Sequence, residues 1–370
     1  MKRKLFLGLL AAAAVLFTAC QKDQTLSEVT EDNTAIGFGT YVGRDAQTKA
    51  YITGIEQLKN MAAGFGVFAY YTGNTLYPNT THDFTPSFMP NEQVYYATDK
   101  WSYSNTKYWP GTTADNLLSF FAYAPYVATA GTNGITELPT SSTPGDPILS
   151  FEDPGNVEDQ FDLLYADPVK DAYYSNTIEN AGKNGYVKFT FNHALSRIGF
   201  KAKVSDEKYQ VTINSINIQG RFNVSGELNL NGGNWNNLSP AASQPDKTSY
   251  NLTSFVNNPI NDKDDYAVLT DDGKYLMVLP TNFTETDLTV TVSYSYIFEY
   301  ESGKWTTGSV TKVVKGTIEK PDFVKGKAYI LAFTINPGEV SRPIMFDVLG
   351  VTDWDDDTDN DGYDMDVEWD

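Results

Sequence analysis

The chain has 370 residues, of which 41% are hydrophobic and 20% are charged. This length and apolar share are enough to bury one large or two ordinary cores, and they exclude a disordered chain. The 47 acidic and 27 basic residues give a formal charge of −20, which argues against a nucleic-acid partner, because affinity for phosphate depends on clustered Lys and Arg.

The first twenty residues are typical of a secretory signal that is removed during maturation. Three positive residues at positions 2–4 precede a run of 15 uncharged residues at 5–19, which is too short to span a membrane as a helix. The run ends at Cys20, the single cysteine of the chain. Residues 16–20 resemble a bacterial lipobox, in which the cysteine is diacylated. We therefore predict a lipid on Cys20 and anchorage in a bacterial outer membrane.

Beyond the signal, apolar and polar residues alternate, as they do in a half-buried strand. Residues 36–42 and 211–218 show this alternation, and turn-forming runs such as 231–233 and 271–273 separate the strands. Only residues 54–61 have helical spacing. The same alternation predicts further strands at residues 65–71, 119–123, 186–191, 198–204, 276–279, 288–298, 329–335 and 344–348.

At least a dozen short strands without helical crossovers indicate an all-β protein made of antiparallel sandwiches, and the length indicates two of them in tandem. We place the boundary near residue 180. The N-terminal domain then covers residues 21–180 and the C-terminal domain covers residues 181–370. A long surface loop is expected at residues 131–147, where Gly, Asn and Pro are frequent.

Residues suited to catalysis are scarce. The chain has two histidines, His82 and His193, so a metal site would need carboxylate ligands, and no metalloprotease, phosphate-loop or serine-hydrolase motif occurs. Gly37 and Gly39 lack the third glycine and the helix of a dinucleotide-binding loop, so we expect strand glycines near a neighbouring backbone. His193 is expected to be a hydrogen-bonded structural residue. The sequence predicts no enzyme, no catalytic residue and no organic cofactor.

The last eighteen residues, 353–370, hold ten acids and no base, which is half of the net charge. Within them, oxygen ligands fall at positions 1, 3, 5 and 12 of a calcium-binding loop, and Gly362 occupies the sharp turn at position 6. No helical pattern leads into the loop. The calcium ligands in this interpretation are Asp357, Asp359, Asp361 and Glu368.

A second pattern overlies the calcium-loop spacing. Tyr363, Met365, Val367 and Trp369 are apolar and alternate with four acids, which is typical of a strand with one apolar and one acidic face. Because alternation over eight residues is the stronger signal, we favour the strand. A calcium ion at the Asp-rich turn before it is compatible with that strand.

A series of short motifs spans nearly the whole mature chain. The segments are Cys20, residues 48–50, 65–70, 101–103, 107–110, 118–125, 191–198, 326–329 and 351–354. In this order they resemble the fimbrillin family, the type V pilins and related fimbrial lipoproteins of Bacteroidetes. The resemblance implies two transthyretin-like β-sandwich domains, export as a lipoprotein and assembly with other pilin subunits into a fimbrium on the cell surface.

The resemblance also implies proteolytic processing. In that family a protease cleaves after a basic residue near the start of the chain and removes an early strand, and a strand from the neighbouring subunit fills the vacated groove. Arg44, just after the predicted strand 36–42, is the expected cleavage site. Lys49 is the second candidate, and residues 21–44 would form the propeptide.

The acidic tail, residues 355–370, has the shape that such a groove requires. We expect Tyr363, Met365, Val367 and Trp369 to fill the groove of a neighbouring subunit as a donor strand. The alternative is that this strand docks on its own domain, as terminal strands often do.

A different class of function stays open beside the fibre subunit. The protein could be a monomeric or tip adhesin that binds a glycan or a host ligand. Trp101, Tyr103, Tyr108 and Trp109 could stack on sugars, although aromatic residues at strand spacing more often pack in a core or along an edge.

Overall fold

The structure is a computed structural model of the chain. It describes residues 35–42, 55–180, 183–240, 248–270, 275–283, 288–306, 310–318, 321–338 and 346–353. Nearly all of these residues that belong to regular elements lie in strands, and the only α-helix among them is α1 (Ile55–Asn60). Within the described ranges, no helix has the length and apolar character needed to cross a membrane.

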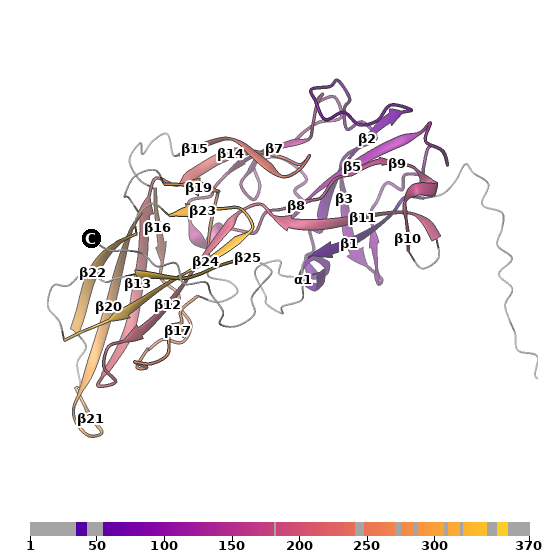
Figure 1. The fold of residues 1–370 in the computed structure, drawn as a ribbon. Coiled ribbons are helices and arrows are strands. Elements are labelled where there is room, and N and C mark those ends of the chain that lie inside the picture. The colour runs from indigo at the N-terminus through magenta and orange to yellow at the C-terminus, as the bar shows by residue number, and fades with distance from the viewer. Residues whose placement is uncertain are drawn as a thin grey trace, which may run out of the picture.

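The first part of the chain forms a nine-stranded sheet (Figure 1). The strand order is β1 (Gly37–Val42), β11 (Lys183–His193), β8 (Leu164–Ala166), β5 (Leu117–Ala124), β2 (Phe65–Gly73), β3 (Met89–Ala97) and β4 (Lys100–Ser102), with β9 (Val169–Ala172) also paired to β5 and β10 (Ile178–Asn180) also paired to β11. The sheet curls, so that β1 at one edge contacts β4 at the other. One face therefore encloses an apolar core that includes the fully buried Phe65, Phe120 and Phe189.

The opposite face of this sheet packs against a four-stranded sheet that is shared between distant parts of the chain (Figure 1). Its order is β15 (Asn234–Pro240), β14 (Asn223–Asn229), β7 (Ile148–Glu152) and β6 (Ile135–Glu137). A second core, which includes Phe68, Tyr123, Leu149 and Leu228, lies between the two sheets. The polypeptide after β11 thus completes the fold of the polypeptide before it.

Two five-stranded sheets follow β11 and face each other. The first has the order β17 (Ala267–Val268), β12 (Ser196–Val204), β24 (Lys327–Ile335) and β25 (Phe346–Asp353), with β18 (Leu276–Val278) paired to β12. The second has the order β16 (Thr248–Leu252), β13 (Tyr209–Gly220), β20 (Leu288–Glu301) and β21 (Lys304–Trp305), with β22 (Val310–Ile318) paired to β20. Phe200 and Phe333 of the first sheet meet Ile216 and Val290 of the second in one buried core, which makes a β-sandwich.

The remaining elements are short and connect these sheets. They are the two-stranded sheet of β19 (Thr281–Asn282) and β23 (Asp322–Phe323) and the 3₁₀ turns η1 (Val157–Asp159) and η2 (Tyr174–Asn176).

The all-β prediction is confirmed, and the predicted helix at residues 54–61 is α1. Most strand pairs are antiparallel as expected, but β1 pairs with β11 and β12 pairs with β24 in parallel, so the two sheets that contain these pairs are mixed. The predicted loop at residues 131–147 is wrong in part, because β6 lies within it and pairs with β7. The chain leaves the nine-stranded sheet between His193 and Ser196. The tandem-domain limits near residue 180 stay a prediction.

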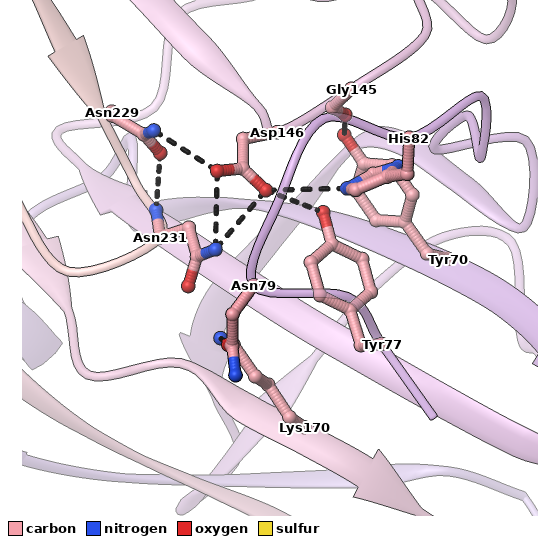
Figure 2. A network of polar contacts seen from close by, with 9 residues as sticks. All are labelled: Tyr70, Tyr77, Asn79, His82, Gly145, Asp146, Lys170, Asn229 and Asn231. Carbon is pink, nitrogen blue, oxygen red and sulfur yellow. Dashed lines mark hydrogen bonds and ion pairs between the residues drawn. The ribbon is translucent and has the colours of Figure 1, made fainter. Parts of the chain in front are cut away.

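A polar network joins the shared sheet to the loop after β2 (Figure 2). At its centre lies Asp146, just before β7. The carboxylate accepts hydrogen bonds from the amides of Asn229 and Asn231 at 3.1 Å and from the Tyr77 hydroxyl at 3.0 Å. His82 Nε2 lies 3.3 Å from the same carboxylate. Because the two asparagines come after β11 and the other residues come before it, one side chain holds both parts of the chain together.

The network favours the ionised form of Asp146. Burial opposes ionisation, but the hydrogen bonds from Asn229, Asn231, Tyr77 and His82 outweigh it and lower the pKa of this carboxyl below its ordinary value of 3.8. The contribution of Asp146 to stability is therefore complete above about pH 4 and is lost as the pH falls through the folded-state pKa.

Asp146→Asn should lower the free energy of unfolding at pH 7 by about 2 kcal/mol, because the new amide places a donor against the donors of Asn229 and Asn231. Below about pH 4 the difference from the unchanged protein should shrink. Denaturant unfolding over a pH series measures both effects. The matched control is Asp83→Asn, which alters an exposed carboxylate and should change stability by less than about 0.5 kcal/mol. Equal losses in the two variants would contradict the role of Asp146.

Candidate functional site

The first strand, β1, fills a slot between β11 and the loop after β4. On one side, residues 37–42 pair in parallel with residues 186–191. On the other side, the Ile36 N–H donates a hydrogen bond to the Lys107 carbonyl at 2.9 Å, and the Tyr103 hydroxyl donates one to the Ile36 carbonyl at 2.9 Å. The strand is therefore held along both edges, with the longer ladder on the β11 side.

Side chains at alternate positions point from this strand into the core of the curled sheet. Ile36, just before β1, and Phe38 are 2% and 3% exposed. The Phe38 ring packs edge-on against Phe65, at 6.3 Å between centroids, and against Tyr103, at 5.3 Å. Burial of a side chain of this size stabilises a protein by about 1.5–3 kcal/mol. The strand is thus part of the core and not only an addition to the sheet edge.

The outer face of β1 carries two glycines. A side-chain carbon at Gly37 would lie 2.4 Å from Cε1 of Tyr186, whereas one at Gly39 would meet nothing within 4 Å. The ring of Tyr186 thus occupies the space of a side chain at position 37. Gly39 is the ladder partner of Lys188. The close approach expected at these glycines is present at Gly37, but the neighbour is an aromatic ring rather than a backbone.

The residues named from the sequence for lipidation, cleavage, strand donation and calcium binding lie outside the described part of the chain. They are Cys20, Arg44, the donor-strand residues Tyr363, Met365, Val367 and Trp369, and the calcium ligands Asp357, Asp359, Asp361 and Glu368. Their roles stay predictions. In the sequence, Arg44 follows the last residue of β1, Val42, by two positions.

The aromatic residues considered for sugar stacking do not form an open platform. Trp109 is 3% exposed, and its indole N–H donates a hydrogen bond to a backbone carbonyl of β11 at 3.1 Å. Trp101 packs edge-on against Phe65 at 5.0 Å, and Tyr103 lines the slot of β1. Of these four residues, only Tyr108 is largely exposed, at 48%. Packing in or against the core is therefore the main role of the other three.

Both histidines have structural partners. His193 Nδ1 lies 3.0 Å from the Asp162 carboxylate, and both side chains are almost fully buried, which confirms the structural role expected for His193. His82 belongs to the network around Asp146. Among the described residues, no three His, Cys, Asp or Glu side chains come together in a way that could hold a metal ion.

The walls of the slot were not identified from the sequence. The alternation at residues 186–191 indicated a strand, but it did not indicate that Tyr186 and Lys188 lie beside Gly37 and Gly39. Nothing in the local pattern assigns Tyr103 to the other wall, because that contact depends on how the sheet curls.

The comparisons with known proteins agree with an all-β fold. Residues 48–354 match the family model described as Fimbrillin-like. This match spans more than half of the chain, and the protein belongs to the fimbrillin-like family. The family is not one of enzymes, which confirms that expectation.

Two similar proteins extend this result. Fimbrium subunit Fim1C of Phocaeicola vulgatus is 27% identical over 383 residues, which cover 95% of this chain and 97% of that protein. The crystal structure of a fimbrial protein from Bacteroides vulgatus matches with a TM-score of 0.69 at 22% identity and covers 87% of this chain and 100% of that one. The structural likeness shows that the two proteins share a fold.

Gly37→Ala should lower the free energy of unfolding by about 1–3 kcal/mol, because the added methyl group forces the Tyr186 ring away from β1. Gly39→Ala is the matched control on the same face of the same strand, and it should change stability by less than about 0.5 kcal/mol. Denaturant unfolding of both variants measures the difference. Similar effects at the two positions would show that Tyr186 does not pack on β1.

Proposed function

We propose that this protein is a structural subunit of a cell-surface fimbrium and that its subunits join by strand exchange. The observation that carries the proposal is β1, an edge strand near the start of the chain whose inward side chains complete a core. Loss of β1 would leave unpaired backbone groups on β11 beside an apolar slot, and a strand from another subunit would satisfy both. The family and the name of the Fim1C relative support a fimbrial role.

In this proposal, the subunit is exported as a lipoprotein and then trimmed. Residues 1–20 are the signal, and a lipid on Cys20 holds the precursor at the outer membrane. Cleavage after Arg44 separates β1 from the rest of the chain. The strand is then held only by its hydrogen bonds and by the burial of Ile36 and Phe38, so it can leave when a competing strand arrives.

The tail of the next subunit supplies that competing strand. Tyr363, Met365, Val367 and Trp369 recur at every second position, and the inward residues of the β1 segment do so too. Free strand edges of this kind drive β-augmentation, in which backbone hydrogen bonds give affinity and alternate side chains enter pockets. The Asp-rich residues before the strand would then lie in the connection between subunits.

Deletion of residues 355–370 should leave a folded subunit that does not polymerise, because the donor strand is gone while the cores are intact. Electron microscopy detects fibres, and size-exclusion chromatography detects monomers. The paired change Met365→Asp and Val367→Asp should have the same effect at full length, whereas Asp370→Asn should still polymerise. Normal fibres from the deletion variant would contradict the assignment of the donor strand. A protein that stays monomeric with its tail intact would instead fit the adhesin alternative.

Arg44→Gln should leave the precursor uncut and unable to assemble, because β1 stays covalently attached beside its slot. Lys49→Gln is the matched control and should be processed normally. N-terminal sequencing of subunits from fibres is expected to begin at Asp45. A sequence that begins at residue 50 would assign the cleavage to Lys49 and would refute Arg44.

A further inference from the structure

The outer face of the second five-stranded sheet of the sandwich is almost free of charge. Val290, Val292 and Tyr294 of β20 enter the core, so the residues between them face outward. The ladders place outward residues of four neighbouring strands side by side. They are Ser249 and Asn251 of β16, Gln210, Thr212, Ser215, Asn217 and Gln219 of β13, Thr289, Thr291, Ser293, Ser295 and Ile297 of β20, and Thr311, Val313 and Lys315 of β22. We call this set the polar face.

Lys315 is the only charged residue of the polar face. Charge is frequent in the rest of the protein, since 20% of its residues are charged. On the outer face of the other five-stranded sheet, Lys201 and Lys203 of β12 alternate with the buried Phe200 and Ala202. A well-solvated protein surface commonly carries charge on about 25–35% of its residues. The lack of charge is therefore a property of this face and not of the whole sandwich.

This distribution of charge favours contact between two copies of the chain. Subunits of charge −20 repel one another where acidic surfaces meet, and burial of an unpaired charge is unfavourable. The polar face avoids both costs, because its one lysine lies on β22, which pairs with β20 alone among the described strands and so forms the rim. Hydroxyl and amide groups both donate and accept hydrogen bonds, so the same face of a second copy can satisfy them.

The polar face consists of short side chains, several of which already bind one another. Asn217 Nδ2 donates a hydrogen bond to Ser249 Oγ at 2.8 Å, and the Ser295 hydroxyl donates one to Asn214 Oδ1 at 3.4 Å. Short side chains lose less rotamer freedom on burial than long charged ones do. Val313, which is 66% exposed, and the threonine methyl groups add apolar area that a contact would remove from water.

Two other kinds of contact fit this part of the molecule less well. Sugars are commonly stacked on aromatic rings, and no residue of the polar face is aromatic. Addition of a strand to the edge of β22 is opposed by Lys312, whose side chain turns inward and donates a hydrogen bond to the Pro337 carbonyl at 2.5 Å. Inward lysines protect edge strands from pairing with other chains. Face-to-face packing is the contact that remains.

The size of the polar face indicates a weak contact. Strands lie about 4.8 Å apart and rise about 3.4 Å per residue, so the face covers on the order of 500 Å². Two such faces would bury roughly 1,000 Å² in total, whereas stable interfaces bury about 1,200–2,000 Å². Single subunits should therefore stay monomeric. In a fibre the same contact recurs at each subunit, and many weak contacts then act together.

We infer that the polar face is a lateral contact through which fibres of this protein bundle side by side, each face packing against the same face of a subunit in a neighbouring fibre. This inference rests on the fimbrial function proposed above. A contact between identical faces is self-complementary, as in a two-fold dimer. The strands of the polar face lie far from β1 in Figure 1, so bundling would leave the β1 slot accessible.

Acidic residues on the polar face should prevent bundling. Thr212 and Thr311 are exposed and lie on either side of Ser295 in the ladders, so Thr212→Glu with Thr311→Glu adds two acids that are not direct ladder partners. Electron microscopy counts bundled and single fibres. The bundled fraction should fall by at least about fivefold, because like charges then meet across the contact. Since fibres form before they bundle, single fibres of this variant also show that its subunits fold.

Two controls separate the place of the new charge from its amount. Thr75→Glu with Thr136→Glu adds the same charge at exposed threonines outside the polar face, and bundling should fall by less than about twofold. Thr212→Asn with Thr311→Asn leaves the polar face uncharged, and its fibres should bundle as the unchanged ones do.

Salt dependence is a second measurement. Salt screens the repulsion between acidic fibres, so the bundled fraction of the unchanged protein should increase between about 20 and about 200 mM salt. Fibres with Thr212→Glu and Thr311→Glu should stay single, because charges in direct contact are screened less than distant ones. A bundled fraction that decreases with salt would indicate bundling by ion pairs and would overturn the inference.

The outcomes distinguish the lateral contact from the fimbrial function itself. Fibres that stay single at every salt concentration, or that bundle equally well with the two acids, would overturn the lateral contact and leave the fimbrial function standing. Single fibres that bind a glycan through the unchanged face, but not through the acidic variant, would assign the face to a sugar and overturn its packing against a second copy. A protein that forms no fibres would overturn the fimbrial function and the lateral contact together.

Discussion

The parallel ladder between β1 and β11 closes the first core of this protein. The nine-stranded sheet has an interior because β1 bridges the gap between β11 and the segment after β4, and Phe38 then packs among rings from several other strands. Without that ladder, an edge of β11 and an apolar wall would face water together. The assembly role proposed for this edge depends on the same contacts that stabilise the isolated subunit.

The rest of the molecule gives this edge a rigid support. The hairpin of β14 and β15 pairs with β7, so the chain after β11 completes a sheet that covers the chain before it. Asp146 reinforces this junction through hydrogen bonds from both sides. Because β11 is a strand of the curled sheet and leads directly into β12 of the sandwich, an event at its outer edge takes place on a strand that connects the two parts.

Local pattern was sufficient to predict strands whose two faces differ strongly, such as β1, β13 and β20, and the short helix α1. It was insufficient for β14, whose residues are largely polar, for β3, whose polar residues follow one another instead of alternating with apolar ones, and for β6, which is only three residues long. The local pattern also could not predict which strands pair with each other. Gly37 and Tyr186 are neighbours through a parallel ladder between distant segments, and only the packing of the complete sheet selects that register. The predicted processing and donor residues all lie outside the described chain. The sequence could therefore predict which kind of site this is, but not which residues contact one another in it.

The two glycines of β1 also affect the entropy of the release that is proposed for this strand. Glycine gives up more conformational freedom than any other residue when it is fixed in a strand, and Gly37 and Gly39 are two of only six residues in β1. A freed β1 therefore regains more disorder than a strand of the same length with a side chain at every position. The strand is suited to a temporary role, since it keeps the core closed in a single subunit and its departure is favoured by its own backbone.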